Sequence, residues 1–158
     1  MQFLRVLLAA GIAATQTVGP ASRSPLVLVK TVTSGDAIGV AGVGRVRLLG
    51  IEAPKLPRGI DGPSSARDAR DRLAGLVLHR WVRLEFDEAR ASGSGHANVL
   101  LEDGTFINAV LVREGFARVA TGKSTRIARL DELKQAEAFA RTYRLGIWSP
   151  TVRGRGVI

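Results

Sequence analysis

The sequence contains no cysteine among its 158 residues. This absence excludes disulfide bonds, thiolate zinc sites, cysteine nucleophiles and lipoprotein anchoring. Long apolar runs are missing as well, and the stretch VLLAAGIAA at 6–14 falls short of the roughly 20 residues that a membrane-spanning helix needs. A chain without covalent cross-links must rely on its hydrophobic core, and this length suffices for one domain.

Negative charge is scarce. The chain has 14 acidic residues against 23 basic ones, which gives a net charge of +9. Nineteen of the basic residues are arginine, whose forked guanidinium binds phosphate and carboxylate oxygens. A basic excess favours polyanionic partners such as nucleic acid, anionic lipid or polyphosphate. Heavy arginine use by a GC-rich genome would give the same composition, so composition alone leaves both explanations open.

The N-terminal residues have the pattern of an export signal. A short positive start, MQFLR, precedes the apolar stretch at 6–14, and the small residues up to Ala21 offer a cleavage site. We therefore predict a signal peptide at 1–21 and a secreted or periplasmic protein with no stable membrane span after cleavage. An uncleaved anchor or a misassigned start codon are the alternatives. One domain is expected at 26–149, followed by a flexible basic tail at 150–158.

Short apolar segments between glycine-containing turns predict five strands, at 25–33, 37–40, 45–51, 81–86 and 97–101. Helical spacing of apolar residues predicts three helices, at 66–77, 108–114 and 125–143. Ser65 and Asp68 have the spacing of a capping box at the start of the first helix. One helix after the third of five strands, with two more at the end, indicates an α+β fold built on an OB-fold five-stranded barrel.

Three stretches carry a family resemblance. They are VRLLGIEAP at 46–54, DGTFINAVLVREGFARV at 103–119 and LGIWS at 145–149. In this order and spacing they resemble the staphylococcal nuclease, or thermonuclease, family over about residues 29–149. The resemblance implies the same barrel fold, a calcium ion, and hydrolysis of the phosphodiester bonds of nucleic acid.

Carried over residue by residue, the resemblance implies a calcium site formed by the carboxylates of Asp36 and Glu52 and the main-chain carbonyl of Ala53. Glu52 stands where the family usually has aspartate, and Ala53 lacks the hydroxyl of the usual threonine. Arg47 matches the first of two arginines that hold the scissile phosphate. Each of these residues also has a plain structural reading, as a turn aspartate, a solvated acid or a cation at a strand edge.

Two positions depart from the family. Lys55 occupies the position of the glutamate that activates water, and His96 occupies that of the second phosphate arginine. Loss of a general base costs about 10²–10⁴ in rate, and loss of one charge donor costs on the order of 10²–10³. Lys55 would also repel a divalent ion, and its ion pair with Glu52 or Asp36 could replace the metal. His96 either supplies a new acid or base or marks a loop that no longer grips phosphate.

These observations leave three hypotheses open. The leading one is an exported, monomeric thermonuclease-like protein that binds DNA, RNA or another polyanion and has weak or no phosphodiesterase activity. The second is an active divalent-metal-dependent endonuclease with a rearranged active site, and the third is a cell-envelope interaction module. The arginines at 67–72 are expected on a solvated helix face. Trp81 and Trp148 are expected to pack in the core or its rim rather than to stack on bases.

Overall fold

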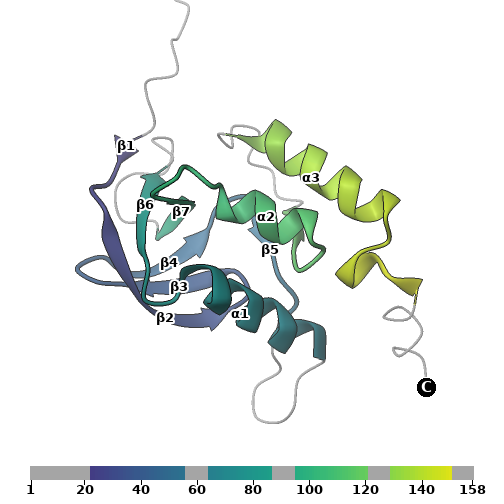
Figure 1. Cartoon of the computed structure of the whole chain (residues 1–158), viewed down its shortest axis with the longest axis horizontal. Helices are drawn as coiled ribbons and strands as arrows, with labels where there is room; N and C mark the ends of the chain where they lie inside the picture. The colour runs from purple at the N-terminus through teal and green to yellow at the C-terminus, as the bar shows by residue number, and fades with distance from the viewer. Residues whose placement is uncertain (1–21, 56–63, 87–94, 121–128, 151–158) are drawn as a thin grey trace, which may run out of the picture.

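Five strands close into a barrel (Figure 1). The computed structural model describes residues 22–55, 64–86, 95–120 and 129–150, so the expected leader and nearly all of the expected tail lie outside the described residues. The barrel strands follow the order β6-β2-β3-β4-β7, and β7 pairs again with β6 to complete the ring. Their bounds are β2 Val27–Ser34, β3 Ala37–Val40, β4 Gly44–Leu48, β6 Trp81–Phe86 and β7 His96–Leu101. The expected α+β OB-fold barrel is confirmed.

Barrel closure depends on the pairing of β4 with β7, which is parallel. The other barrel pairings are antiparallel, and a short strand, β1 (Ser22–Arg23), extends the sheet beside β6. Parallel neighbours cannot be joined by a tight hairpin. The chain therefore travels through a helix and β6 before β7 returns to lie beside β4, which brings Arg47 and His96 into register.

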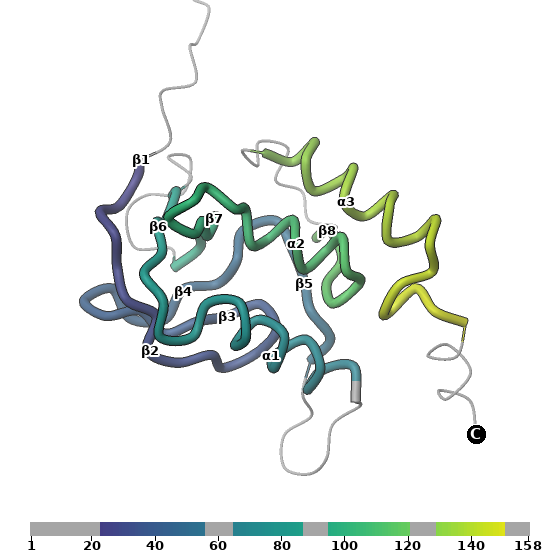
Figure 2. Tube along the Cα trace, in the orientation of Figure 1, coloured from purple at the N-terminus to yellow at the C-terminus, as the bar shows by residue number. Residues whose placement is uncertain are grey.

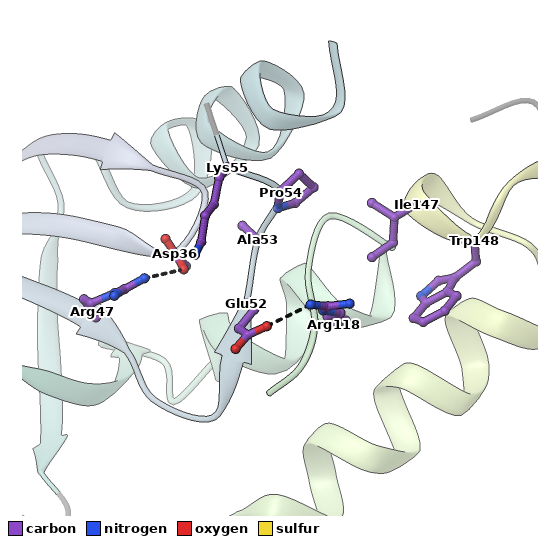
Figure 3. Close-up of a pocket in the computed structure, with 9 residues that line it drawn as sticks. All are labelled: Asp36, Arg47, Glu52, Ala53, Pro54, Lys55, Arg118, Ile147 and Trp148. Carbon is purple, nitrogen blue, oxygen red and sulfur yellow. Dashed lines mark hydrogen bonds and ion pairs between the residues drawn. The ribbon is translucent and has the colours of Figure 1, made fainter. Parts of the chain in front are cut away.

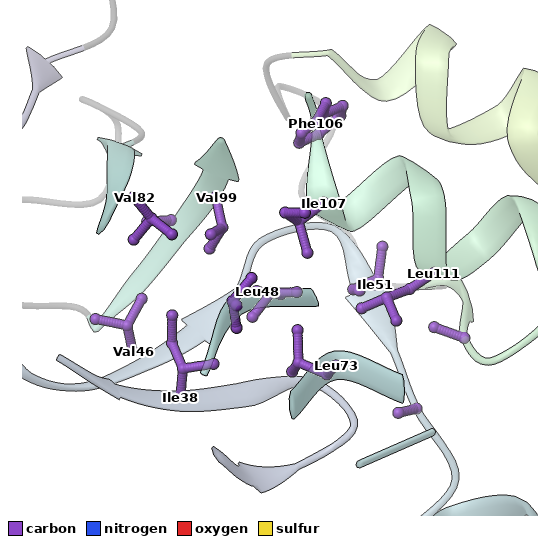
Figure 4. Packing of buried hydrophobic residues seen from close by; sticks show 14 of the residues in the cluster. Ile38, Val46, Leu48, Ile51, Leu73, Val82, Val99, Phe106, Ile107 and Leu111 are labelled. Atoms are coloured by element: carbon purple, nitrogen blue, oxygen red, sulfur yellow. The ribbon is translucent and has the colours of Figure 1, made fainter. Parts of the chain in front are cut away.

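Alternating side chains of the strands fill the barrel. In β6, Val82 and Leu84 are fully buried, whereas Arg83 between them is exposed. β-Branched residues suit this half-buried, pleated surface. Figure 4 shows the strand residues packed against side chains from two helices; those labelled are Ile38, Val46, Leu48, Ile51, Leu73, Val82, Val99, Phe106, Ile107 and Leu111. The core therefore includes the helices as well as the strands.

Three α-helices and one 3-10 turn pack outside the barrel. They are α1 Ser64–Val77, α2 Ile107–Arg113, α3 Leu130–Thr142 and η1 Gly146–Trp148. In Figure 1, α2 lies between the barrel and α3. The three predicted helices are confirmed, although residues 125–128 of the last prediction lie outside the described residues. Within the described ranges, no helix combines the length and apolarity that a bilayer crossing requires.

The start of α1 corrects one detail of the sequence analysis. The helix begins at Ser64, which places Ser65 inside the first turn instead of at the cap, so the capping-box prediction is wrong. The inner face is as the spacing predicted, because Ala66, Ala69, Leu73 and Val77 are fully buried.

The predicted strand at 45–51 is in fact two strands. β4 ends at Leu48, and β5 (Ile51–Glu52) begins after Gly50, whose φ of +76° turns the chain. A residue with positive φ favours glycine, which has no Cβ to clash with the backbone. β5 then leaves the barrel and pairs antiparallel with β8 (Arg118–Val119), as Figure 2 shows. The sequence pattern missed this bend because apolar residues continue on both sides of it.

Asn108 holds the bend in place. Its side chain, at the start of α2, is fully buried. The amide nitrogen donates to the Leu49 carbonyl at 2.9 Å, and the amide oxygen accepts from the Val99 backbone N–H at 3.0 Å. Buried backbone groups cost about 1–3 kcal/mol each when they have no partner. One side chain therefore satisfies polar groups of both β7 and the β4–β5 bend.

The arginine face of α1 is more than a solvated surface. Arg72 forms a bidentate pair with Glu114, at 2.6 Å from Nε and 2.7 Å from Nη2, and so connects α1 to the end of α2. Hydrogen bonding to Glu114 raises the pKa of the Arg72 guanidinium. The expectation of a purely solvated helix face is therefore wrong for Arg72.

Two glycines dock the C-terminal segment onto α2. Gly115 and Gly146 both have positive φ, and the Ile147 N–H donates to the Gly115 carbonyl at 2.9 Å. A Cβ on Gly146 would lie 2.2 Å from the Gly115 carbonyl oxygen, and a Cβ on Gly115 would lie 2.3 Å from the Leu145 carbonyl oxygen. Only backbone without side chains can make this contact, which fixes η1 beside the end of α2.

We expect Gly146→Ala to destabilise the protein by about 2–5 kcal/mol, because left-handed strain and a backbone clash add together. Gly104→Ala is the matched control, since Gly104 also has positive φ but its Cβ would meet nothing within 4 Å. The control should lose only about 1–2 kcal/mol from strain. Urea unfolding of both variants measures the difference. Equal losses would show that the close backbone contact contributes nothing.

Candidate phosphate-binding site

A pocket of about 640 Å³ opens where the barrel meets the C-terminal segment (Figure 3). Its lining residues are Asp36, Arg47, Glu52, Ala53, Pro54, Lys55, Arg118, Ile147 and Trp148. They come from the β2–β3 turn, β4, β5 and the residues after it, β8 and η1. The pocket thus brings together five of the six site residues that the sequence predicted, and it adds Pro54, Arg118, Ile147 and Trp148.

Asp36 is held tightly at the base of the pocket. Its Oδ1 accepts from the Ser34 hydroxyl at 2.7 Å, and its Oδ2 lies 3.2 Å from Nη2 of Arg47. The turn before it packs closely, because a Cβ on Gly35 would lie 2.6 Å from the Cβ of Ala69. The Asp36 side chain is only 10% exposed, whereas that of Arg47 is 48% exposed. The acid therefore orients the guanidinium, and the guanidinium keeps an open edge for a ligand.

Glu52 and Arg118 form a second pair across β5 and β8. The two residues are directly opposite in the antiparallel register, and Arg118 Nη2 lies 3.1 Å from Glu52 Oε2. The Arg118 side chain is 56% exposed, so it too remains open to the pocket. Arg118 was missed in the sequence because its partner strand is distant along the chain. The available signal was its place between buried Ala117 and half-buried Val119 in an apolar stretch.

Lys55 is exposed and extends into the pocket toward Asp36 in the view of Figure 3. Neither carboxylate pairs with it, because Asp36 pairs with Arg47 and Glu52 pairs with Arg118. The ion pair of Lys55 with Glu52 or Asp36 that could have replaced the metal is not formed. Among the described residues, Lys55 has no ion-pair partner, so its ammonium is available to bind an anionic ligand.

His96 does not join the other site residues. It is half-buried at the start of β7, beside Arg47 in the parallel register, but it is absent from the pocket lining formed by the described residues. Sequence position alone could not show this, because strand register does not say on which side of the barrel wall a side chain ends.

The residues of the pocket do not fit a calcium ion as they stand. Calcium takes six to eight oxygen ligands, largely from carboxylates and carbonyls. Here both oxygens of Asp36 and one of Glu52 already accept from protein donors. The lining holds three cationic side chains and two carboxylates, and in the described parts of the chain no group of three or more His, Cys, Asp or Glu residues could hold a metal. This charge balance favours an anion.

Ile147 and Trp148 form the apolar wall of the pocket. The guanidinium of Arg141 lies over the Trp148 ring, 4.2 Å from its centroid. Trp148 is half-buried, so it belongs to the rim, as expected, and also faces the cavity. Trp81 is 53% exposed and lies on β6, outside this pocket.

Comparison with known proteins agrees with this architecture. A family model described as "Staphylococcal nuclease homologue" matches residues 45–150, well over half of the chain. The matched range contains Arg47, Glu52, Lys55, Arg118 and Trp148, and Asp36 lies before it. No curated protein matches the chain. The family is in general one of calcium-dependent nucleases. The barrel, the order of its helices and the family match together show that the chain belongs to the staphylococcal nuclease family.

Proposed function

We propose that this chain is an exported nucleic-acid-binding protein with weak or no phosphodiesterase activity. The observation that carries the proposal is the position of Lys55. The pocket holds an ammonium on the residue that the family resemblance matches to the activating glutamate, and both carboxylates of that pocket are already paired with arginines. The site is thus suited to holding phosphate more than to cleaving it.

The chemistry of hydrolysis supports weak activity. Cleavage of a phosphodiester needs a group that takes a proton from water and a charge that stabilises the phosphate as it reacts. A protonated lysine cannot accept that proton. It also opposes a divalent ion, because two unit charges about 4 Å apart interact by roughly 4 kcal/mol at an effective dielectric constant of 20, and a divalent ion doubles this figure. Arg47 and Arg118 still offer the charge that binds phosphate.

Charge supports nucleic acid as the ligand. Among the described residues, the pocket lining carries one more cation than carboxylates, and the whole chain carries a net charge of +9. Guanidinium groups bind phosphate oxygens through paired donors. The family match supports nucleic acid over other polyanions. The second candidate, a nuclease that works through a rearranged site, is favoured by the same family match.

Export is part of the proposal, and its support is the sequence at 1–21, where a positive start, an apolar stretch and small residues follow one another. Secretion or release into a periplasm follows from it, with the domain acting as a monomer. The mass of the full-length gene product recovered from the exported fraction tests this directly. Loss of about the first 21 residues is expected, and an intact N-terminus in the cytosol would contradict it.

We expect Lys55→Glu to gain metal-dependent cleavage of DNA, because the substitution restores a base and changes the pocket charge from one positive to one negative. A fluorogenic single-stranded DNA assay with calcium, magnesium or manganese measures the gain, which should be about 10²-fold or more over wild type. Lys134→Glu makes the same charge change on an exposed position of α3 and should gain nothing. Efficient cleavage by the wild type would instead establish the second candidate.

Binding of single-stranded DNA should weaken steeply as salt rises, since each phosphate contact releases counterions. Lys55→Gln removes one pocket cation without leaving an acid unpaired. It should weaken binding and lower the slope of log affinity against log salt by about 0.7. Lys134→Gln should leave the slope unchanged. Fluorescence anisotropy of a labelled oligonucleotide provides the measurement, and no binding by the wild type at low salt would end the proposal.

A further inference from the structure

A second groove, of about 540 Å³, adjoins the pocket at the C-terminal end of α3. Its lining residues are Arg141, Arg144, Trp148 and Pro150. Trp148 lines both cavities, so the groove and the pocket share one wall. Building on the proposed function, we infer that a bound single strand of nucleic acid continues from the pocket over Trp148 into this groove, where Arg144 binds a further phosphate.

The charge of the groove points to an anion. Among the described residues that line it, two are arginines and none is acidic. Arg141 shares its charge with Glu137, at 3.1 Å, and lies over the Trp148 ring. Arg144 has no ion-pair partner among the described residues and is exposed. Cations near the end of a helix also offset its dipole, a role that Arg141 in the last turn already fills.

The backbone holds Arg144 in a fixed place. It follows α3 in the left-handed conformation, with φ of +54°, and its N–H donates to the Arg141 carbonyl at 3.2 Å. The next residue, Leu145, donates to the Ala140 carbonyl at 2.9 Å. The contact of Gly146 with Gly115 then anchors the segment on α2. Arg144 is therefore carried by a turn that is tied on both sides.

Trp148 favours a single strand of nucleic acid over other polyanions as the ligand. Base stacking on an aromatic ring needs unpaired bases, and proteins that bind single strands combine such rings with a cationic track. Here one indole lines two cavities, and the described residues that line them together include five cations and two carboxylates. Polyphosphate or an anionic lipid headgroup would use the arginines but would gain nothing from the ring. Trp148 thus has a ligand role that the sequence analysis did not expect.

Thymidine oligonucleotides of increasing length, from the mononucleotide to about 16 residues, the upper range for one OB fold, test the inference. The chain has two tryptophans, so Trp148 fluorescence can be followed alone in a Trp81→Phe background. Arg144→Asn removes the charge while asparagine tolerates the left-handed backbone. Arg83→Gln removes a charge from an exposed site on β6, which lies on the opposite side of the molecule from η1 in Figure 1.

Binding should quench Trp148. Arg144→Asn should leave mononucleotide affinity unchanged, weaken long oligonucleotides, and lower their salt slope by about 0.7; Arg83→Gln should match its parent at every length. If the wild type binds long oligonucleotides and Arg144→Asn binds them equally well, the proposed function stands while this inference is overturned. Equal binding of polyphosphate, with the same length dependence, or of duplex DNA also overturns it, because the ring would then have no part. If no oligonucleotide binds, whatever its length, both the proposed function and this inference are overturned.

Discussion

The buried amide of Asn108 is the constraint on which the pocket depends. It satisfies the carbonyl of Leu49 at the β4–β5 bend and the N–H of Val99 in β7. Because those groups are paired, the chain can leave the barrel after Leu48 without leaving backbone polar groups unpaired in the core. β5 is then free to pair with β8. Glu52 consequently faces Arg118, and Lys55 lines the same pocket as Asp36 of the β2–β3 turn. A straight strand through 45–51 would have kept these side chains on the barrel wall.

Each carboxylate of the pocket has its own arginine, and the lysine is left over. The exposed pair of Glu52 with Arg118 contributes little to stability, about 0–1 kcal/mol, so its effect is mainly positional. Asp36 and Glu52 hold two guanidiniums with open edges toward the same cavity. In a metal-dependent site the two carboxylates would be ligands of the metal ion. Here the same two carboxylates pair with arginine side chains. The pocket therefore presents guanidinium groups to a ligand and is suited to anions.

The sequence predicted the barrel and its helices well, because alternation and helical spacing report burial directly. It also identified Asp36, Arg47, Glu52, Ala53 and Lys55, all of which line one pocket. It failed where long-range pairing decides. The bend after Leu48 and the partner of Glu52 depend on long-range strand pairing, which local patterns do not contain. The possible ion pair of Lys55 with one of the acids is likewise not formed, since arginines of β4 and β8 pair with Asp36 and Glu52.

The main-chain contact between Gly115 and Gly146 has a consequence for biosynthesis. Both acids of the pocket and two of its three cations, Arg47 and Lys55, lie within 36–55, whereas the wall formed by Ile147 and Trp148 is translated much later. At about 5–20 residues per second, the interval is on the order of ten seconds. Throughout it, a nascent chain would carry these charged residues without the wall of Ile147 and Trp148, and the cavity could be completed only after Gly146 has emerged.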